Sequence, residues 1–337
     1  GLQATFGAQR VIDTPISEAT IVGAGVGMAL VGMRPVVEMR VVDFALCAMD
    51  EIVNQAAKNR YMFGGQGRVP LVMRLPIGFW SNSAAQHSQS LEAWFAHLPG
   101  VVVMCPATPQ DNYSMLTHAL RGEDPVIYME NKELWGLQGE VDDGLVYTPG
   151  RAHVLRRGAD LTLVSWSAAM HTTSQAAEAL AAQGVDASVI DLGTLWPWDR
   201  QAVLDDVART RRLLVVHDAV QTAGFGAEVA ATAAQASARR SNSSSASPNS
   251  AASDGRPPLP PYLRSSVLSA SCQIPETGNL SWYCSWGTGE KFVTATSGIP
   301  LSDQRVNARV LPAPSSPTIH WKPSATISFS HKAGMRL

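Results

Sequence analysis

Four short apolar runs decide the fold: RPVVEM (34–39), VPLVMRL (69–75), GVVVMCP (100–106) and PVIYME (125–130). They lack the polar alternation of half-exposed strands, and helical patterns separate them, over residues 19–32, 44–61, 91–97 and 110–120. Buried strands that alternate with helices indicate a parallel sheet that is covered on both faces. We therefore predict an α/β domain over the first part of the chain.

The same pattern restarts after a polar connection at residues 138–150. Strands and helices then alternate in the order LTLVSWS (161–167), helix 172–183, ASVIDL (187–192), helix 199–209, RLLVVHD (212–218) and helix 227–235. The fold class predicted is α/β, with two tandem three-layer domains and mainly parallel sheets, over residues 1–140 and 150–235.

Composition changes near residue 236. Residues 1–235 carry 16 Lys and Arg against 24 Asp and Glu, whereas residues 236–337 carry 10 against 4 and hold 21 Ser and 11 Pro. Such a segment buries too little apolar surface to offset its chain entropy. We predict a low-complexity linker and tail over 236–337, in which GNLSWYCSW and EKFVTATSGI have some strand character.

Composition also excludes several classes of protein. The chain is 45% apolar with a net charge of −2, which argues against nucleic acid as its main partner. No apolar run reaches the ~18 residues of a membrane span, and no signal peptide pattern opens the chain. The four cysteines have no CxxC spacing and indicate neither a disulfide framework nor a zinc ribbon. A soluble intracellular protein is expected, with no nucleic acid and no membrane partner.

The glycine-rich stretch GAGVGMA (23–29) invites comparison with a dinucleotide-binding motif. It fails at the sixth position, which is Met28, and it follows no predicted strand. The stretch GFGAEVA (224–230) fails in the same way. We expect these small residues to allow close packing between helices.

Two polar segments are candidates for chemistry. In DTPISE (13–18), Thr14 can cap a helix that begins at Pro15, which places Glu18 in the first turn. That carboxylate either complements the helix dipole or serves a function. In AAQHSQS (84–90), His87 lies in a loop that enters a helix, as a hydrogen-bonded structural histidine or as a functional one.

Taken together, these segments resemble the β subunit of the thiamine-diphosphate-dependent E1 component of 2-oxo acid dehydrogenase complexes, with pyruvate and acetoin dehydrogenases as the nearest types. The resemblance covers residues 1–235 and rests on motifs in the right order: DTPISE, RPVVEMRVVDFALCAMDEIVNQAAKNRYMFGGQ, VPLVMR, AAQHSQSLEAWFAHLPG, DPVIYMENKELWG, VIDLGTLWPWD and LLVVHDAVQTAGFGAEVAA. It implies a pyrimidine-binding domain, truncated before Gly1, and an incomplete transketolase C-terminal-like domain. The Ser/Pro-rich tail does not align.

The resemblance implies a thiamine diphosphate site shared between α and β subunits of an α2β2 heterotetramer, in which α binds the diphosphate and Mg²⁺. Glu18 matches the glutamate that hydrogen-bonds N1′ of the aminopyrimidine, and protonation there favours the tautomer whose 4′-nitrogen removes the C2 proton. Phe44 matches an aromatic residue that packs against the aminopyrimidine. Cys47 stands where the family usually has Gln. His87 matches a histidine near the channel mouth, associated with lipoyl transfer.

A structural potassium site is also implied, largely through carbonyl oxygens. The matching positions are Leu71, Ala119, Leu120, Gly122 and Asp124.

The function implied is oxidative decarboxylation of pyruvate, or of a related 2-oxo acid or acetoin. The acyl group passes to lipoyl groups of the E2 acyltransferase core, and activity needs an α subunit. The compartment implied is the cytoplasm, or the mitochondrial matrix or plastid in a eukaryote. Two alternatives stay open: an incomplete or inactive homologue that binds no cofactor, and an unrelated nucleotide-binding α/β protein.

Overall fold

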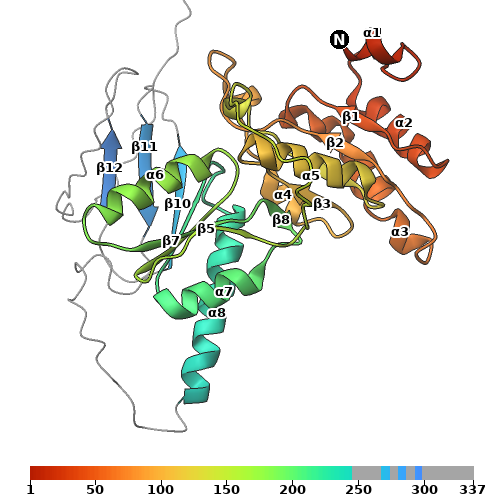
Figure 1. Cartoon of the computed structure of the whole chain (residues 1–337). Helices are drawn as coiled ribbons and strands as arrows, with labels where there is room; N and C mark the ends of the chain where they lie inside the picture. The colour runs from red at the N-terminus through yellow and green to blue at the C-terminus, as the bar shows by residue number, and fades with distance from the viewer. Residues whose placement is uncertain (245–266, 274–279, 286–292, 298–337) are drawn as a thin grey trace, which may run out of the picture.

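The structure is a computed structural model that describes residues 1–244, 267–273, 280–285 and 293–297. Within these residues the chain forms two sheets, each with helices packed against it (Figure 1). The predicted α/β fold with mainly parallel sheets is confirmed.

The first unit is built on a sheet with the strand order β1-β2-β4-β3-β8, in which the first four strands run parallel. Its own strands are β1 (Val36–Glu38), β2 (Val72–Arg74), β3 (Val102–Met104) and β4 (Val126–Tyr128). Its helices and helical turns are α1 (Leu2–Phe6), α2 (Glu18–Leu30), η1 (Val42–Ala48), η2 (Glu51–Ala56), α3 (Asn59–Met62), η3 (Ala85–His87), α4 (Glu92–Ala96), α5 (Pro109–Arg121) and η4 (Lys132–Leu134).

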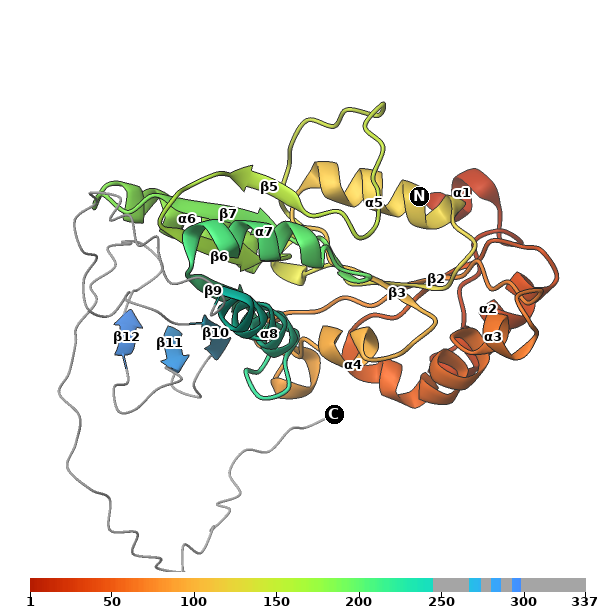
Figure 2. The ribbon, with the colours of Figure 1, turned by 90° about the horizontal axis from the view of Figure 1, so that it is seen from below.

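Helices cover both faces of this sheet, because alternate strand residues are apolar on both sides. One face packs on Met115 and Ala119 of α5 and consists of Val72, Met104, Val126 and Tyr128. The opposite face joins the core that includes α2, η1 and α4, and it consists of Val37, Met73, Val103 and Ile127. Figure 2 shows α5 on one side of the sheet and α2 and α4 on the other.

The second unit contains a parallel trio, with β6 (Leu161–Ser165) between β7 (Ala187–Asp191) and β9 (Leu213–His217). β5 (His153–Arg156) joins β7 antiparallel. Beyond β9 the sheet continues through β10 (Val267–Gln273), β11 (Leu280–Ser285) and β12 (Val293–Ser297). One apolar cluster joins β6 and β7 to α6 (Ala169–Ala181). The other face packs on α7 (Arg200–Thr210) and α8 (Phe225–Ser244).

The two units share a core. β8 (Thr194–Trp196) leaves the second unit and pairs antiparallel with β3 of the first. Side chains also bond across the junction: Nε1 of Trp166 donates to Oε1 of Glu92 at 3.2 Å, and Nδ2 of Asn131 donates to Oδ2 of Asp218 at 3.1 Å. Burial raises the pKa of Asp218 to about 7. This junction fixes the carboxyl edge of the first sheet against the second unit.

Several local predictions were wrong. The single helix predicted over 44–61 is three separate helical segments: η1, η2 and α3. Helix α2 begins at Glu18 after Ser17, not at Pro15 after Thr14. Both Thr14 and Ser17 belong to the residue types that precede helices, so the sequence offers two starting points. The helix predicted over 227–235 continues to Ser244. The predicted linker and tail otherwise lies mostly outside the described residues.

The glycines of α2 do allow close packing, but Gly25 lies against a sheet. A methyl group there lies 2.8 Å from Cγ1 of Val37 and 3.1 Å from Cδ1 of Leu71. Among the described residues, the helices fall short of the length and apolar character that crossing a bilayer requires.

Candidate functional site

The candidate site lies at the carboxyl edge of the first sheet, where the loops after parallel strands meet. Phe44 belongs to η1, which follows β1, and His87 ends η3, which follows β2. The edge of the His87 imidazole meets the Phe44 ring, with 5.2 Å between the ring centroids and 86° between the planes. The structure therefore brings together two residues that are 43 positions apart in the sequence.

Two tryptophans extend this contact, and the sequence analysis missed both. The Trp80 ring lies 6.4 Å from that of His87 and 6.2 Å from that of Trp135, which follows β4. The Arg40 guanidinium lies over the Trp80 ring at 5.2 Å from its centroid, a geometry that favours cation–π attraction. Arg40, Trp80 and Trp135 each follow a predicted strand, at 34–39, 69–75 and 125–130. That position is the signal that could have found them.

Glu18 is the first residue of α2, and α2 packs along η1. Its side chain is half-buried, and within the described residues its carboxylate has no hydrogen bond or ion pair. Nearby, Oγ of Ser17 donates to Oγ1 of Thr20 at 2.9 Å. The carboxylate is thus free to bond a ligand.

Cys47 is a free cysteine that is exposed to solvent. It lies three residues after Phe44 in the 3₁₀ turn of η1, where residues i and i+3 stack on one face. Phe44 itself is 37% exposed. The two side chains therefore share the open face of η1.

Buried polar side chains lie next to the segments that carry Phe44 and His87. Nε2 of Gln89 donates to Oδ1 of Asp43 at 2.8 Å. Lys132 is also buried, and burial lowers the pKa of its ammonium to about 8, although the Asp43 and Glu133 carboxylates raise it. Burial raises the pKa of Glu133. The Nδ1 atom of His87 is buried and has no hydrogen bond within the described residues.

The five positions predicted for potassium lie at the opposite end of the sheet. The carbonyl oxygens of Leu120 and Gly122 both accept from the Arg34 guanidinium. Leu71 accepts the Val126 N–H at 2.9 Å, and Ala119 accepts that of Gly122 at 3.2 Å. The carboxylate of Asp124 pairs with Arg60, N to O 2.8 Å. The guanidinium of Arg34 thus already provides a cationic partner for two of the five.

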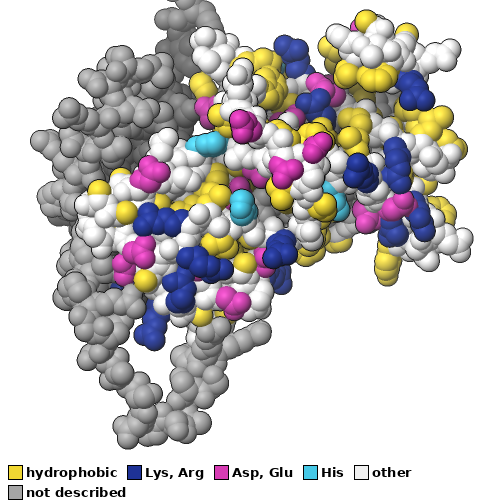
Figure 3. Space-filling view, in the orientation of Figure 1, with side chains coloured by type: hydrophobic (Ala, Val, Ile, Leu, Met, Phe, Trp, Pro, Cys, Tyr) yellow, Lys and Arg dark blue, Asp and Glu magenta, His cyan; other side chains and the backbone are white. Residues whose placement is uncertain are grey.

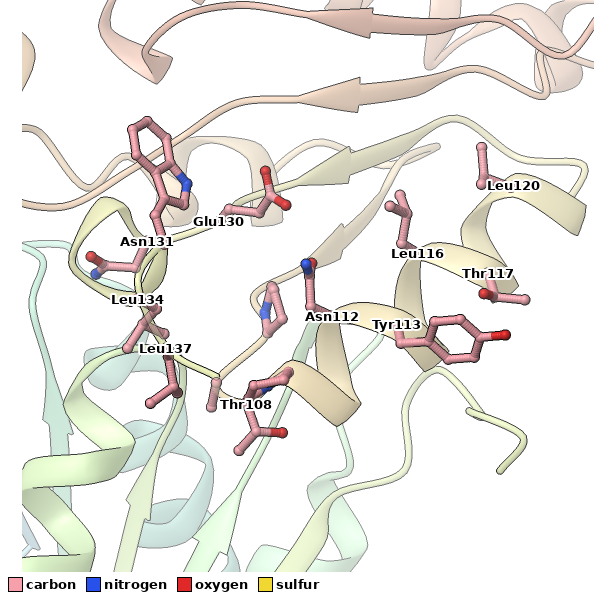
Figure 4. A pocket seen from close by; sticks show the side chains of 14 residues that line it. Thr108, Asn112, Tyr113, Leu116, Thr117, Leu120, Glu130, Asn131, Leu134 and Leu137 are labelled. Carbon is pink, nitrogen blue, oxygen red and sulfur yellow. The ribbon is translucent and has the colours of Figure 1, made fainter. Parts of the chain in front are cut away.

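A cavity of about 510 Å³ opens beside the candidate site. Figure 4 shows Asn112 and Leu116 of α5 on one wall and Leu134 and Leu137 on another. Trp135 lines this cavity and also touches the Trp80 ring. Trp135 is therefore the member of the aromatic cluster that borders the cavity.

The side chains present fit the aminopyrimidine half of thiamine diphosphate. Glu18 offers an unbonded carboxyl group to a ring nitrogen, and the open Phe44 ring offers an apolar surface to a flat heterocycle. Among the residues described, no three His, Cys, Asp or Glu side chains come close enough together to hold a metal ion.

Comparison with known proteins first defines the class. Residues 1–137 match the family described as "Transketolase, pyrimidine binding domain", and residues 150–253 match "Transketolase, C-terminal domain". A chain titled "Split gene transketolase, inactive beta4 tetramer" shares the fold, with a TM-score of 0.57 and 23% identity over 65% of this chain and 69% of that chain. The chain is therefore an α/β protein of the transketolase type.

Curated relatives then narrow the class. The chain is 44% identical over 236 residues, 70% of each chain, to "Acetoin:2,6-dichlorophenolindophenol oxidoreductase subunit beta" of Cupriavidus necator. It is 44% identical to "Pyruvate dehydrogenase E1 component subunit beta" of Rhizobium meliloti, over 68% of this chain and 50% of that protein. It is 40% identical to "2-oxoisovalerate dehydrogenase subunit beta" of Bacillus subtilis, over 68% of this chain and 71% of that protein. The chain belongs to the family of β subunits of the E1 components of 2-oxo acid and acetoin dehydrogenases.

Proposed function

We propose that this chain is the β half of an α2β2 E1 component that carries out the oxidative decarboxylation of pyruvate or a related 2-oxo acid, or the oxidative cleavage of acetoin. The acyl group passes to lipoyl groups of an E2 acyltransferase. The observation that carries the proposal is the Phe44–His87 contact on the open carboxyl edge of the pyrimidine-binding domain, with α2 and its unbonded Glu18 packed alongside.

When bound, thiamine diphosphate supplies an electron sink for the carbanion that decarboxylation creates. The carboxyl group of Glu18 holds a proton at N1′ of the aminopyrimidine ring. Phe44 would pack on that ring and keep water from its face, with Cys47 on the same face of η1. His87 holds or passes a proton at the mouth of the site, since an imidazole offers one nitrogen that donates and one that accepts.

The proposal requires an α subunit that completes the site and binds the diphosphate and Mg²⁺. Large apolar side chains lie open on the first unit, which favours such a partner. They include Leu2, Phe6, Ile12, Ile16, Tyr61 and Met62. Figure 3 shows apolar side chains gathered over the region of α1.

Two further parts of the proposal rest on the resemblance to the family. Potassium binds the carbonyl oxygens of Leu71, Ala119, Leu120 and Gly122 together with Asp124. The complex works in the cytoplasm, or in the mitochondrial matrix or plastid of a eukaryote.

The test is calorimetric titration of thiamine diphosphate with Mg²⁺ into the full chain, alone and assembled with an α subunit of the family. We expect binding only in the assembled complex, and Phe44→Ala weakens it about tenfold through lost apolar contact. Leu155→Ala, at an exposed position of β5, is the matched control. An assembled complex that binds no cofactor refutes the proposal and favours the inactive homologue. Full affinity in the isolated chain contradicts a shared site.

A further inference from the structure

We propose that Trp80 is a positioning residue for His87, and that ring packing holds the imidazole where a hydrogen bond usually sets the orientation of a functional histidine. The contacts that carry this inference join the loop after β2 to the turn after β1. The inference rests on the proposed function only where it assigns His87 a part in the reaction.

The His87 imidazole has no hydrogen bond that would fix its orientation. Nδ1 is buried and unpartnered within the described residues, and none of those residues bonds Nε2 either. In a functional histidine, the bond that one ring nitrogen makes to a carbonyl or carboxylate normally decides which way the other nitrogen points. The orientation of this ring therefore comes from packing.

Two aromatic rings pack on the imidazole. The Phe44 ring lies 5.2 Å from it, with 86° between the planes. The Trp80 ring lies 6.4 Å from it, with 65° between the planes. Both geometries fall in the range in which aromatic rings attract each other edge to face. Because Phe44 belongs to η1 and Trp80 to the loop after β2, the imidazole contacts two separate segments.

Trp80 is itself held by residues of two other segments. The Arg40 guanidinium, which follows β1, lies over the Trp80 ring at 5.2 Å from its centroid. Trp135, which follows β4, meets the same ring at 6.2 Å and 77°. The Trp80 side chain is half-buried. These contacts restrict the rotation of the indole, as a residue that positions another must be restricted.

The backbone of the loop brings Trp80 beside His87. The N–H of Trp80 donates to Oγ of Ser88, the residue after His87, at 3.1 Å. At the base of the loop, the N–H of Gly78 donates to the carbonyl of Gln89 at 3.2 Å. These bonds fold the loop back on itself, so the contact between the two rings is built into the loop.

A purely structural tryptophan makes a different prediction from a positioning one. If Trp80 only buries apolar surface, its replacement costs stability, and the His87 ring keeps its surroundings as long as the chain stays folded. If Trp80 positions His87, the surroundings of the ring change in the folded state. Nuclear magnetic resonance separates the two roles, because the orientation of an aromatic ring shifts the resonances of the protons next to it.

The first experiment records proton–carbon spectra of the full chain without cofactor, labelled with carbon-13 at Cε1 of histidine. His87→Gln identifies the His87 resonance by its loss. Trp80→Leu should move that resonance more than any other histidine resonance. Trp80→Phe should move it less, because an aromatic ring remains beside the imidazole.

The matched control is Trp94→Leu. Trp94 is 53% exposed in α4 and makes no ring contact within the described part of the chain. This variant should leave the His87 resonance in place. An unchanged His87 resonance in folded Trp80→Leu overturns the inference. If melting curves show that Trp80→Leu is unfolded, Arg40→Gln decides, since it keeps both rings and removes only the cation over Trp80; no shift of the His87 resonance there overturns the inference.

The second experiment measures kcat and KM for pyruvate in a complex with an α subunit, with a lipoyl domain as acceptor. Trp80→Leu should lower kcat about tenfold or more and leave KM nearly unchanged, because a misplaced reacting group costs rate and not binding. Trp80→Phe should recover most of the rate, and Trp94→Leu should behave as the wild type. Unchanged kcat in Trp80→Leu contradicts a role of Trp80 in the reaction. If even the wild-type complex shows no turnover, the proposed function fails, while the spectra still decide whether Trp80 positions His87.

Discussion

Gly25 and Gly27 lie two residues apart in α2, the helix that begins at Glu18, yet their surroundings differ. A methyl group at Gly25 lies 2.8 Å from Cγ1 of Val37 and 3.1 Å from Cδ1 of Leu71, whereas one at Gly27 has no neighbour within 4 Å. Substitution by alanine adds the same methyl group and the same helix propensity at both positions. The difference between the variants therefore isolates the packing of α2 on the sheet.

The magnitudes follow from these distances. Alanine stabilises a helix interior by ~1 kcal/mol relative to glycine, so Gly27→Ala should raise the free energy of unfolding by about that amount. Overpacking of a core costs about 1–3 kcal/mol. Gly25→Ala combines the two effects, so its free energy of unfolding should lie between that of the wild type and about 2 kcal/mol below it. The two variants should therefore differ by roughly 1–3 kcal/mol.

The assay is thermal unfolding of the full chain followed by circular dichroism, with the wild type and both variants at one concentration. Gly27→Ala should melt several degrees above Gly25→Ala. Equal midpoints, or a higher midpoint for Gly25→Ala, would refute the close approach of α2 to β1 and β2.

Two further outcomes are expected. Burial raises the pKa of Asp191 to about 8, so the unfolded state releases this proton first and the free energy of unfolding falls as pH rises from about 4 to about 8. Asp191→Asn keeps the acceptor for the Gly193 N–H and should be more stable than the wild type at pH 8 but not at pH 4, by at most ~5 kcal/mol for a shift of this size. Identical dependence of stability on pH in the two proteins contradicts this. Replacing NaCl by KCl at constant ionic strength should raise the melting temperature by mass action if the potassium proposal holds. Arg34→Gln, which frees the carbonyls of Leu120 and Gly122, should enlarge that effect.

The parallel strands were predictable because each is a short apolar run that is buried on both faces. The strands of the second unit at 161–165, 187–191 and 213–217 lie inside the predicted runs. β5 and β8 were missed since HVLR and TLW are short and mix polar with apolar residues. The pairing of β8 with β3 is a tertiary contact between units, and no local pattern encodes it.

The main residues of the candidate site were predictable from the sequence, but the buried charged residues next to them were not. The resemblance supplied Glu18, Phe44 and His87, and the meeting of strand ends explains why the last two come together. The buried charges of Asp43 and Lys132 carry no sequence signal, because a charged residue in a loop is normally solvated. Their burial depends on how three loops close over the sheet edge.

Exchange of the C2 proton of thiamine diphosphate tests the central claim most directly, because it depends on Glu18 and not on later lipoyl transfer. The measurement compares the wild type with Glu18→Gln in a complex with an α subunit, Mg²⁺ and the cofactor. If Glu18 supplies the proton at N1′, exchange should slow by ~10²–10⁴-fold, or roughly 3–5 kcal/mol of barrier. A carboxylate that only complements a helix dipole is worth at most ~1 kcal/mol of stability and leaves exchange unchanged. Near wild-type exchange in a competent Glu18→Gln complex would contradict the account.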